Sequence, residues 1–345
     1  MNVQTRLAQA GTLALTGLLL FSLGLLIGRI LAETDGPRQR SGRIMPERSR
    51  DFDLTNPLLE CEGGGDSIGN QALRPFKDEL ARVVDRLIRS GLARQISVYF
   101  RDLNNGPWYG IDENIEFYPA SLLKVPLAMA VMKESESDPQ MLTRAVINTP
   151  QENRRAAGPS TPTGTLVRGQ TYTIEELLEI MLTLSDADAA ALLAQHVDPA
   201  VAAGVFSDLG IPAPAEAGRD VLSVRSFAKF FRVLFNASYL TKRSSEQILS
   251  LLSRSSFRSG IASGVPDGVT VANKYGQQEL GPRGEIRELH DCGIVYYPKS
   301  PYLLCIMTKG ERFEGNAAAI QEISRFVFSI VDAHESGKAW GNRDR

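Results

Sequence analysis

The first strongly periodic part of the chain, residues 75–91, carries apolar side chains at intervals of three and four residues. This spacing predicts a helix with one buried face, and Gly91 provides its end. Residues 95–103 are typical of a strand, and residues 108–111 form its expected partner across a tight turn at 104–106. The domain should therefore begin with a helix and a β-hairpin.

Most of residues 120–255 has a helical pattern, interrupted by the polar, loop-like segment 134–172. One helix start is marked by a capping box at 173–176, in which a threonine caps the helix and a glutamate reaches back. Strand patterns return near the end of the chain, and a last amphipathic helix follows them. The three strands are predicted at 269–275, 289–297 and 302–308, with a turn at 298–301.

This order of elements, a helix, two strands, a helical block, three strands and a helix, predicts the α+β class. The simplest packing is one five-stranded antiparallel sheet flanked by the terminal helices, with an inserted all-helical subdomain. We assign residues 71–340 to this domain, with 71–118 and 262–340 in the α/β part and 119–261 in the helical part.

An uncharged segment near the start, residues 11–28, reaches membrane-spanning length when it is extended to residues 11–32. It follows a short tail, residues 1–10. Two interpretations remain: an N-terminal transmembrane helix that anchors the protein, which we favour, or a secretory signal cleaved after Ala32. Residues 33–70 are polar and then glycine-rich, which is typical of a linker.

The charges around this apolar segment conflict with an exported domain. Five arginines lie between residues 38 and 50 on its C-terminal side, whereas Arg6 is the one charged side chain before it. By the positive-inside rule, the arginine-rich side should stay in the cytoplasm.

Composition and charge narrow the class of protein. The chain has 345 residues, of which 43% are hydrophobic and 23% charged, as in a globular protein with a sizeable core. The formal net charge of −2 gives no reason to expect nucleic acid as a partner. Three cysteines exclude a disulfide scaffold and a paired-cysteine zinc site, and three histidines leave little room for a metal cluster. We therefore expect no metal and no cofactor.

Candidate chemistry begins with Ser121 and Lys124, which share one face of an apolar helix. Burial would lower the pKa of Lys124, and its neutral amine could then take a proton from the Ser121 hydroxyl. The positive end of the helix near Ser121 would favour an anionic oxygen. This combination predicts an activated serine nucleophile; the alternative is a surface lysine on an ordinary amphipathic helix.

Two further polar groups interrupt apolar segments. Ser185 and Asp186 follow an apolar helix, where they could instead form a helix-to-helix junction with one of them as the next cap. Lys274-Tyr275-Gly276 lies in a predicted strand.

These three motifs, in this chain order, resemble the S-x-x-K, S-D-N and K-T-G signature of the class A β-lactamases and the penicillin-recognising serine D,D-peptidases. The resemblance covers roughly residues 70–335. It implies that Ser121 is acylated, that Lys124 or a water it orients takes the proton, and that Ser185 relays a proton to the leaving nitrogen. It further implies that Lys274 holds Ser185 electrostatically and attracts a substrate carboxylate.

The same resemblance implies the substrate-binding residues. The backbone N–H groups of the nucleophile and of Gln277 would form an oxyanion hole, and Gly276 would let a substrate lie against the strand edge. Asp186 is a further candidate contact. Two positions depart from the signature, because Tyr275 replaces threonine and Ala187 replaces asparagine.

The base for deacylation is harder to assign. The lactamases carry a glutamate that activates the deacylating water, in a loop ahead of an Arg-Asp pair. Here the pair is Arg219-Asp220, and no E-x-x-L-N sequence precedes it. Glu216 is the one nearby glutamate, so it is the candidate base.

Two functions follow from the resemblance. The first is a serine hydrolase that forms an acyl-enzyme at Ser121 with β-lactams or with D-Ala-D-Ala-type peptidoglycan stem peptides. The alternative is a sensor domain that binds penicillin or a wall peptide without turnover. A Ser-His-Asp hydrolase is disfavoured, because none of the three histidines lies in a nucleophile-elbow sequence. The resemblance implies an extracytoplasmic domain, anchored through residues 11–32 or secreted if the chain is cleaved after Ala32.

The tripeptide His-Asp-Cys at 290–292 suggests a metal or thiol site, but the apolar alternation that follows favours strand packing and a buried cysteine. The turn at 298–301 would place Cys292 and Cys305 on adjacent strands in diagonal register, where a disulfide would be strained. We therefore expect Cys61 to pair with one of them if the compartment is oxidising.

Overall fold

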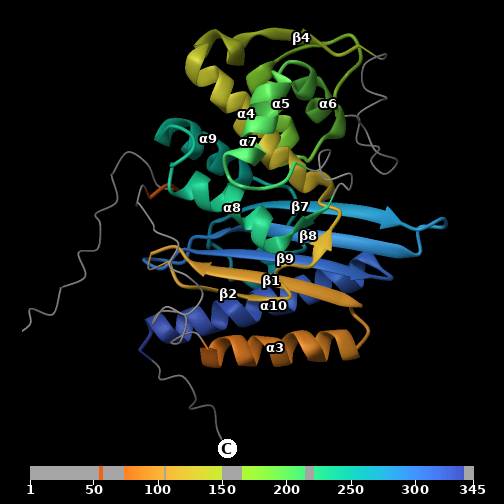
Figure 1. Cartoon of the computed structure of the whole chain (residues 1–345), viewed down its shortest axis with the longest axis vertical. Helices are drawn as coiled ribbons and strands as arrows, with labels where there is room; N and C mark the ends of the chain where they lie inside the picture. The colour runs from red at the N-terminus through yellow and green to blue at the C-terminus, as the bar shows by residue number, and fades with distance from the viewer. Residues whose placement is uncertain (1–53, 57–73, 105, 150–164, 214–220, 338–345) are drawn as a thin grey trace, which may run out of the picture. The chain divides into compact units, whose positions relative to one another are not determined.

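The computed structural model describes residues 54–56, 74–104, 106–149, 165–213 and 221–337 (Figure 1). The chain divides into two compact units, Met1–Arg48 and Ser49–Arg345, and the described residues belong to the second. The predicted anchor, residues 11–32, lies outside them and stays a prediction. Within the described segments, no single helix is both long and apolar enough to cross a membrane. One bent pair, α6 (Ala187–Gln195) and α7 (Pro199–Ser207), meets that test by length and composition only.

One antiparallel sheet forms the centre of the second unit, as the order of elements predicted. Its five strands stand in the order β2-β1-β9-β8-β7. Their bounds are Trp108–Ile111 for β2, Gln95–Asp102 for β1, Tyr302–Gly310 for β9, Ile286–Val295 for β8 and Val271–Leu280 for β7. The early and late parts of the chain therefore meet at the β1–β9 pair, and β7 lies at the edge of the sheet.

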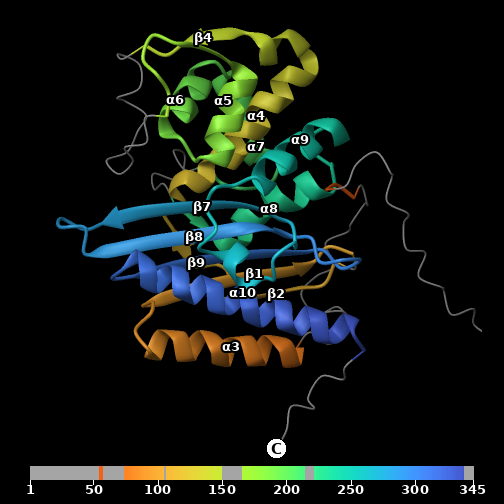
Figure 2. The ribbon, with the colours of Figure 1, turned by 180° about the vertical axis from the view of Figure 1, so that it is seen from behind.

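Helices cover both faces of the sheet (Figures 1 and 2). The terminal helices α3 (Arg74–Arg89) and α10 (Phe313–Glu335) pack on one face, and α8 (Val224–Phe235) packs on the other. Neighbouring residues of β9 point to opposite faces of the sheet. Leu304 belongs to the core beneath the terminal helices, and Cys305 belongs to the core beneath the helical block. The predicted α+β fold, with a flanked five-stranded sheet and an inserted helical subdomain, is confirmed.

The block between β2 and β7 contains the expected helices and two small sheets that the sequence pattern did not predict. The helical elements of the block are η1 (Ala120–Leu123), α4 (Lys124–Ser137), η2 (Pro139–Thr143), α5 (Ile174–Thr183), α6, α7, α8, α9 (Lys242–Ser253) and η3 (Ile261–Gly264). β3 (Glu116–Phe117) pairs with β6 (Leu222–Ser223), and β4 (Ala145–Ile147) pairs with β5 (Thr171–Thr173). Strands this short show no period of two, so β4 and β5 were missed within the loop-like segment 134–172.

The predicted capping box starts α5. The N–H of Glu176 donates to Thr173 Oγ1 at 3.1 Å, and Glu176 Oε2 accepts from the N–H of Thr173 at 2.7 Å. Two backbone donors at the helix end are thereby satisfied, and this prediction is confirmed.

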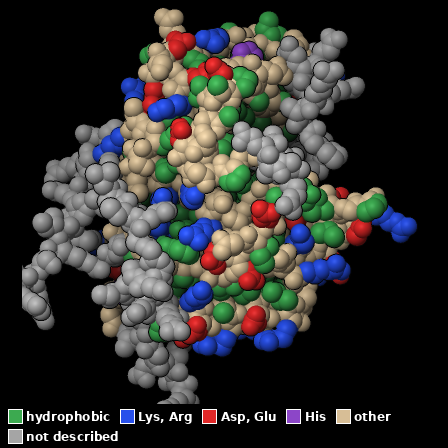
Figure 3. Space-filling model, viewed as in Figure 1, with side chains coloured by type: hydrophobic (Ala, Val, Ile, Leu, Met, Phe, Trp, Pro, Cys, Tyr) green, Lys and Arg blue, Asp and Glu red, His purple; other side chains and the backbone are tan. Residues whose placement is uncertain are grey.

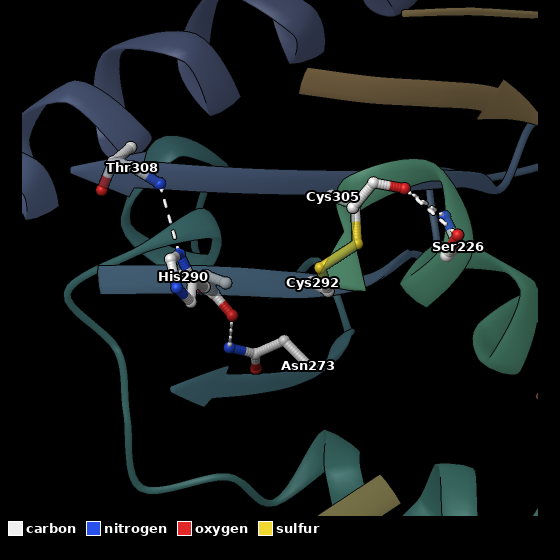
Figure 4. The surroundings of a disulfide bond; sticks show 8 residues. Ser226, Asn273, His290, Cys292, Cys305 and Thr308 are labelled. Carbon is white, nitrogen blue, oxygen red and sulfur yellow. Dashed lines mark hydrogen bonds between the residues drawn. A yellow bond between two sulfur atoms is a disulfide. The ribbon is translucent and has the colours of Figure 1, made fainter. Parts of the chain in front are cut away.

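Cys292 of β8 and Cys305 of β9 form a disulfide, which corrects the predicted diagonal register (Figure 4). All of residues 296–301 form the connection, so the two cysteines are direct cross-strand partners. The prediction took 298–301 alone as the turn. With that turn, each residue of β8 would face a residue of β9 two positions further along the chain than its observed partner. Because both cysteines share one bond, the expected pairing of Cys61 with either of them is wrong.

A short piece of the predicted linker packs on the domain. The N–H of Leu54 donates to Glu246 of α9 at 2.9 Å, and its carbonyl accepts from the hydroxyl of Tyr296 at 2.8 Å. The N–H of Asn56 donates to the carbonyl of Phe235, at the end of α8, at 2.7 Å. These contacts make the short piece part of the folded domain surface.

The surface in view carries mixed charge. Figure 3 shows Lys and Arg side chains interspersed with Asp and Glu over the described part of that face, which agrees with 38 basic and 40 acidic residues in the chain.

The intact, non-reduced protein should show one free thiol after denaturation, because the Cys292–Cys305 bond leaves Cys61 as the third cysteine. Alkylation followed by mass spectrometry gives the count. Cys61→Ser is the matched control and should show no free thiol. Three free thiols in the wild-type chain would contradict the bond.

Candidate active site

Ser121 lies in a tight turn at the start of a buried helix. The turn is the 3₁₀ helix η1, and α4 begins at Lys124, so the α-helix starts after the serine and not before it. Ala120 has a φ of 48°, in the left-handed region that strains a residue with a Cβ. Pro126 stands in the first turn of α4, where a backbone N–H has no partner within the helix.

Lys124 is the centre of the site. Its Nζ lies 3.0 Å from Ser121 Oγ and 3.3 Å from Ser185 Oγ, and it also donates to the Ser185 carbonyl. The lysine is only 7% exposed. Burial lowers the pKa of Lys124 to about 8, although the Asp186 carboxylate partly opposes the shift. A neutral amine that can accept a proton is therefore available at mildly alkaline pH.

Ser185 connects Lys124 to a second lysine. It lies between α5 and α6 with a φ of 60°. Lys274 Nζ donates to Ser185 Oγ at 2.7 Å and to the Tyr275 carbonyl at 2.9 Å. Burial, and then the charge of Lys124, hold the pKa of Lys274 well below its ordinary value. The structure thus brings the four predicted catalytic side chains into one hydrogen-bonded group, Ser121, Lys124, Ser185 and Lys274.

Asp186 is buried behind Ser185. Its carboxylate accepts from the N–H of Ala189 at 2.8 Å, as the cap of α6, and also from the Thr165 hydroxyl. These contacts agree with the alternative interpretation, in which this segment joins two helices and one of its residues caps the second. Asp186 has no exposed surface with which to contact a substrate. Ala187 is the first residue of α6.

Gly276 of β7 lets the nucleophile segment approach the edge of the sheet. A Cβ atom at this position would lie 2.5 Å from the Pro119 carbonyl oxygen and 3.1 Å from the Leu122 nitrogen. The close neighbour is therefore the backbone around Ser121, where the sequence resemblance pointed to a substrate. Gln277 follows on the same edge strand, beside this contact, with an exposed side chain.

Tyr275 belongs to an aromatic pair. Its ring stacks on Phe257 with the ring centroids 4.1 Å apart, and Lys274 Nζ lies 4.4 Å from the centre of the tyrosine ring. This position therefore has an aromatic ring in contact with Phe257 and Lys274 where the signature has a small hydroxyl group. Sequence reasoning missed Phe257, because its contact joins segments that are distant in the chain.

The candidate deacylation base, Glu216, falls within residues 214–220, which lie outside the described part of the chain. Its role stays a prediction, as does that of the Arg219-Asp220 pair. The description resumes after this segment, where Ser223 caps α8 by accepting from the N–H of Ser226 at 3.2 Å.

The tripeptide 290–292 is buried in β8, as the packing interpretation predicted. Asp291 accepts from the Asn273 side chain and from the N–H of Ile261, each at 2.8 Å. Burial raises the pKa of Asp291 to about 7 despite these bonds. The described residues contain no group of three or more His, Cys, Asp or Glu side chains that could hold a metal ion.

This fold and this serine–lysine site define a serine hydrolase of the β-lactamase kind. Residues 76–331 match the family model of the Beta-lactamase enzyme family, and the chain belongs to that family. It is 25% identical to a β-lactamase of Streptomyces albus G over 273 residues, which are 74% of this chain and 83% of the relative.

Solved structures share the fold. A class A β-lactamase from Mycobacterium abscessus matches with a TM-score of 0.62 and 23% identity, over 74% of this chain and 99% of that one. A β-lactamase from Xanthomonas campestris has a TM-score of 0.64 and 21% identity, over 74% and 98%. A mutant of PBP-A, solved as an acyl-enzyme complex with penicillin G, has a TM-score of 0.62 and 21% identity, over 74% and 97%.

The acylation rate should rise with pH and level off above about 8, because Lys124 accepts a proton only as the neutral amine and its pKa is about 8. The rate of fluorescent-penicillin labelling at Ser121, followed across pH, measures this. Lys124→Arg keeps its charge throughout, so it should lower the rate about 100-fold or more and abolish the pH dependence.

Lys133 provides the matched control, since it lies on the same helix with its Nζ 3.1 Å from the Tyr239 carbonyl. Lys133→Ala should keep the wild-type profile. A wild-type rate that does not change with pH would show that Lys124 is not the base.

Proposed function

We propose that this hydrolase forms an acyl-enzyme at Ser121 with β-lactams or with the D-Ala-D-Ala ends of peptidoglycan stem peptides. The observation that carries the proposal is a serine hydroxyl 3.0 Å from the amine of a buried lysine, Lys124, whose pKa is lowered. Acyl transfer needs a nucleophile, a base and a proton donor for the leaving nitrogen. Ser121, Lys124 and Ser185 are suited to these three tasks.

In the proposed acylation, Ser121 Oγ bonds to the substrate carbonyl carbon while its proton moves to neutral Lys124. The carbonyl oxygen gains negative charge, which the N–H groups of Ser121 and Gln277 stabilise. The C–N bond then breaks, and the leaving nitrogen takes the proton of the Ser185 hydroxyl. Lys124, whose Nζ lies 3.3 Å from Ser185 Oγ, gives Ser185 a proton in its place. Lys274, 2.7 Å from Ser185 Oγ, stabilises the oxygen during this relay.

Release of the acyl group should be slow. Hydrolysis needs a base for the attacking water, and Glu216 stands in a sequence unlike that of the lactamases. Tyr275 and Ala187 also replace two signature residues that contact a β-lactam. The same features favour the second candidate function, a sensor that stays acylated. The acyl-enzyme of the PBP-A mutant with penicillin G supports acylation on this fold.

We also propose that residues 11–32 anchor the chain in the membrane and that the domain is extracytoplasmic. The Cys292–Cys305 disulfide supports this location, because structural disulfides persist mainly in oxidising compartments. The disulfide thus opposes the arginine pattern of residues 38–50, which favours a cytoplasmic location for the domain. A C-terminal alkaline phosphatase fusion should be active if the proposal is correct, and inactive if the domain stays in the cytoplasm.

Ser121→Ala should abolish covalent labelling by a β-lactam and leave the fold intact, since it removes the nucleophilic oxygen and little volume. Intact-mass spectrometry over time is the measurement, and the wild-type chain should gain the mass of one β-lactam. Ser137→Ala, at the exposed end of α4, the helix that follows Ser121, is the matched control and should label normally.

The time course separates the two candidate functions. An adduct that disappears within minutes indicates a hydrolase with efficient turnover, whereas a persistent adduct indicates slow release or a sensor. A wild-type chain that gains no mass, or an alanine variant that still does, would overturn acylation at Ser121.

A further inference from the structure

Two buried residues of β8, Glu288 and His290, hydrogen-bond to the main chain of Tyr118. The N–H of Tyr118 donates to Glu288 Oε2 at 3.0 Å, and the carbonyl of Tyr118 accepts from His290 Nε2 at 3.0 Å. Both β8 residues have no exposed surface. Since Tyr118 stands three positions before Ser121, these bonds fix the backbone that leads into the nucleophile.

The hydrogen bonds of His290 indicate which of its two ring nitrogens carries the proton. The N–H of Thr308 donates to Nδ1 at 3.3 Å, so Nδ1 is an acceptor (Figure 4). Because the Tyr118 carbonyl can only accept, the ring proton is on Nε2. Phe117 packs edge-to-face on the imidazole with the ring centroids 5.4 Å apart. The ring is thus oriented by its neighbours as well as by its own bond to Tyr118.

Glu288 is held as a charged group inside the protein. Lys309 Nζ lies 3.0 Å from its Oε1, and His290 Nε2 lies 3.6 Å from its Oε2. Burial raises the pKa of Glu288, but His290 and Lys309 outweigh that effect and the net pKa is below its ordinary value. A buried carboxylate is costly, and apolar residues would fill the same volume with less penalty. Packing alone therefore does not explain this pair.

The segment that leads into Ser121 also packs against Gly276, next to His290 in the sheet. His290 is the direct cross-strand partner of Gly276, and cross-strand partners project to the same face. The Pro119 carbonyl oxygen occupies the space that a Cβ of Gly276 would need. The following residue, Ala120, has the strained φ of 48°. Such a conformation persists only where the surroundings fix it, and β7 and β8 provide those surroundings.

We propose that Glu288 and His290 are positioning residues for acylation. By restraining the main chain of Tyr118, they set the N–H and the Oγ of Ser121 relative to Lys124. This inference rests on the proposed function, and it adds two residues that lie outside the three signature motifs.

Variants of the full chain test the inference by stopped-flow labelling with a fluorescent penicillin, which separates the dissociation constant from the acylation rate constant. His290→Leu removes the donor to the Tyr118 carbonyl and should lower the rate constant about tenfold, with the dissociation constant unchanged. His290→Gln offers an amide to the same carbonyl and should recover most of the rate. Glu288→Gln keeps an acceptor for the N–H and should lower the rate about threefold.

Ser324→Ala is the matched control for a lost buried hydrogen bond. Ser324 lies in α10, on the other side of the sheet, and its Oγ donates to the Ile261 carbonyl at 2.8 Å. This variant should lose stability and keep the wild-type acylation rate constant. A wild-type rate constant in His290→Leu, or slowing that His290→Gln does not recover, would overturn the inference. If His290→Leu does not fold, an unchanged rate constant in Glu288→Gln overturns it equally.

Amide hydrogen exchange separates this inference from the proposed function. If the wild-type chain is never labelled at Ser121, the proposed function fails, and exchange then tests the restraint by itself. The Tyr118 amide should exchange about tenfold faster in Glu288→Ala than in the wild-type chain or in Ser324→Ala. Equal exchange in all three would show that Glu288 does not restrain this backbone.

Discussion

The site depends on one lysine amine held out of water between two serine hydroxyls. Lys124 reaches both Ser121 and Ser185, and its low exposure is what brings its pKa down to about 8. Burial, and then the charge of Lys124, also hold the pKa of the second lysine, Lys274, well below its ordinary value. Ser185 bonds to both amines, so in the proposed acylation the lysine that takes the first proton also contacts the hydroxyl that supplies the next one.

The sheet makes this arrangement possible by placing β7 at its edge. Lys274 extends from β7 toward Ser185, and two residues later the absence of a side chain at Gly276 admits the turn that carries Ser121. On the neighbouring strand, Cys292 is the cross-strand partner of Lys274 and is itself bonded to Cys305 of β9. The disulfide therefore joins β8 and β9 at the position where β8 pairs with the second lysine.

The departures from the signature change the surroundings of the four polar side chains more than the bonds among them. The four side chains proposed for acylation lie together, but the aromatic pair of Tyr275 and Phe257 stands where the signature has a small hydroxyl beside Lys274. Lys274 is also fully buried with a lowered pKa, which would weaken the attraction for a substrate carboxylate that the resemblance implies.

The sequence by itself determined the order of the main helices and of the five strands of the large sheet, the capping box at 173–176 and the spacing of Ser121 and Lys124, because each depends on residues that are close in the chain. Only the tertiary structure decided that Ser185 meets both Lys124 and Lys274, because burial and long-range packing set those distances. The Cys292–Cys305 pairing was missed for a related reason, since the register of a hairpin depends on where its connection ends. The contacts of Gly276 and of Glu288 with the segment before Ser121 likewise join parts of the chain that no local pattern connects.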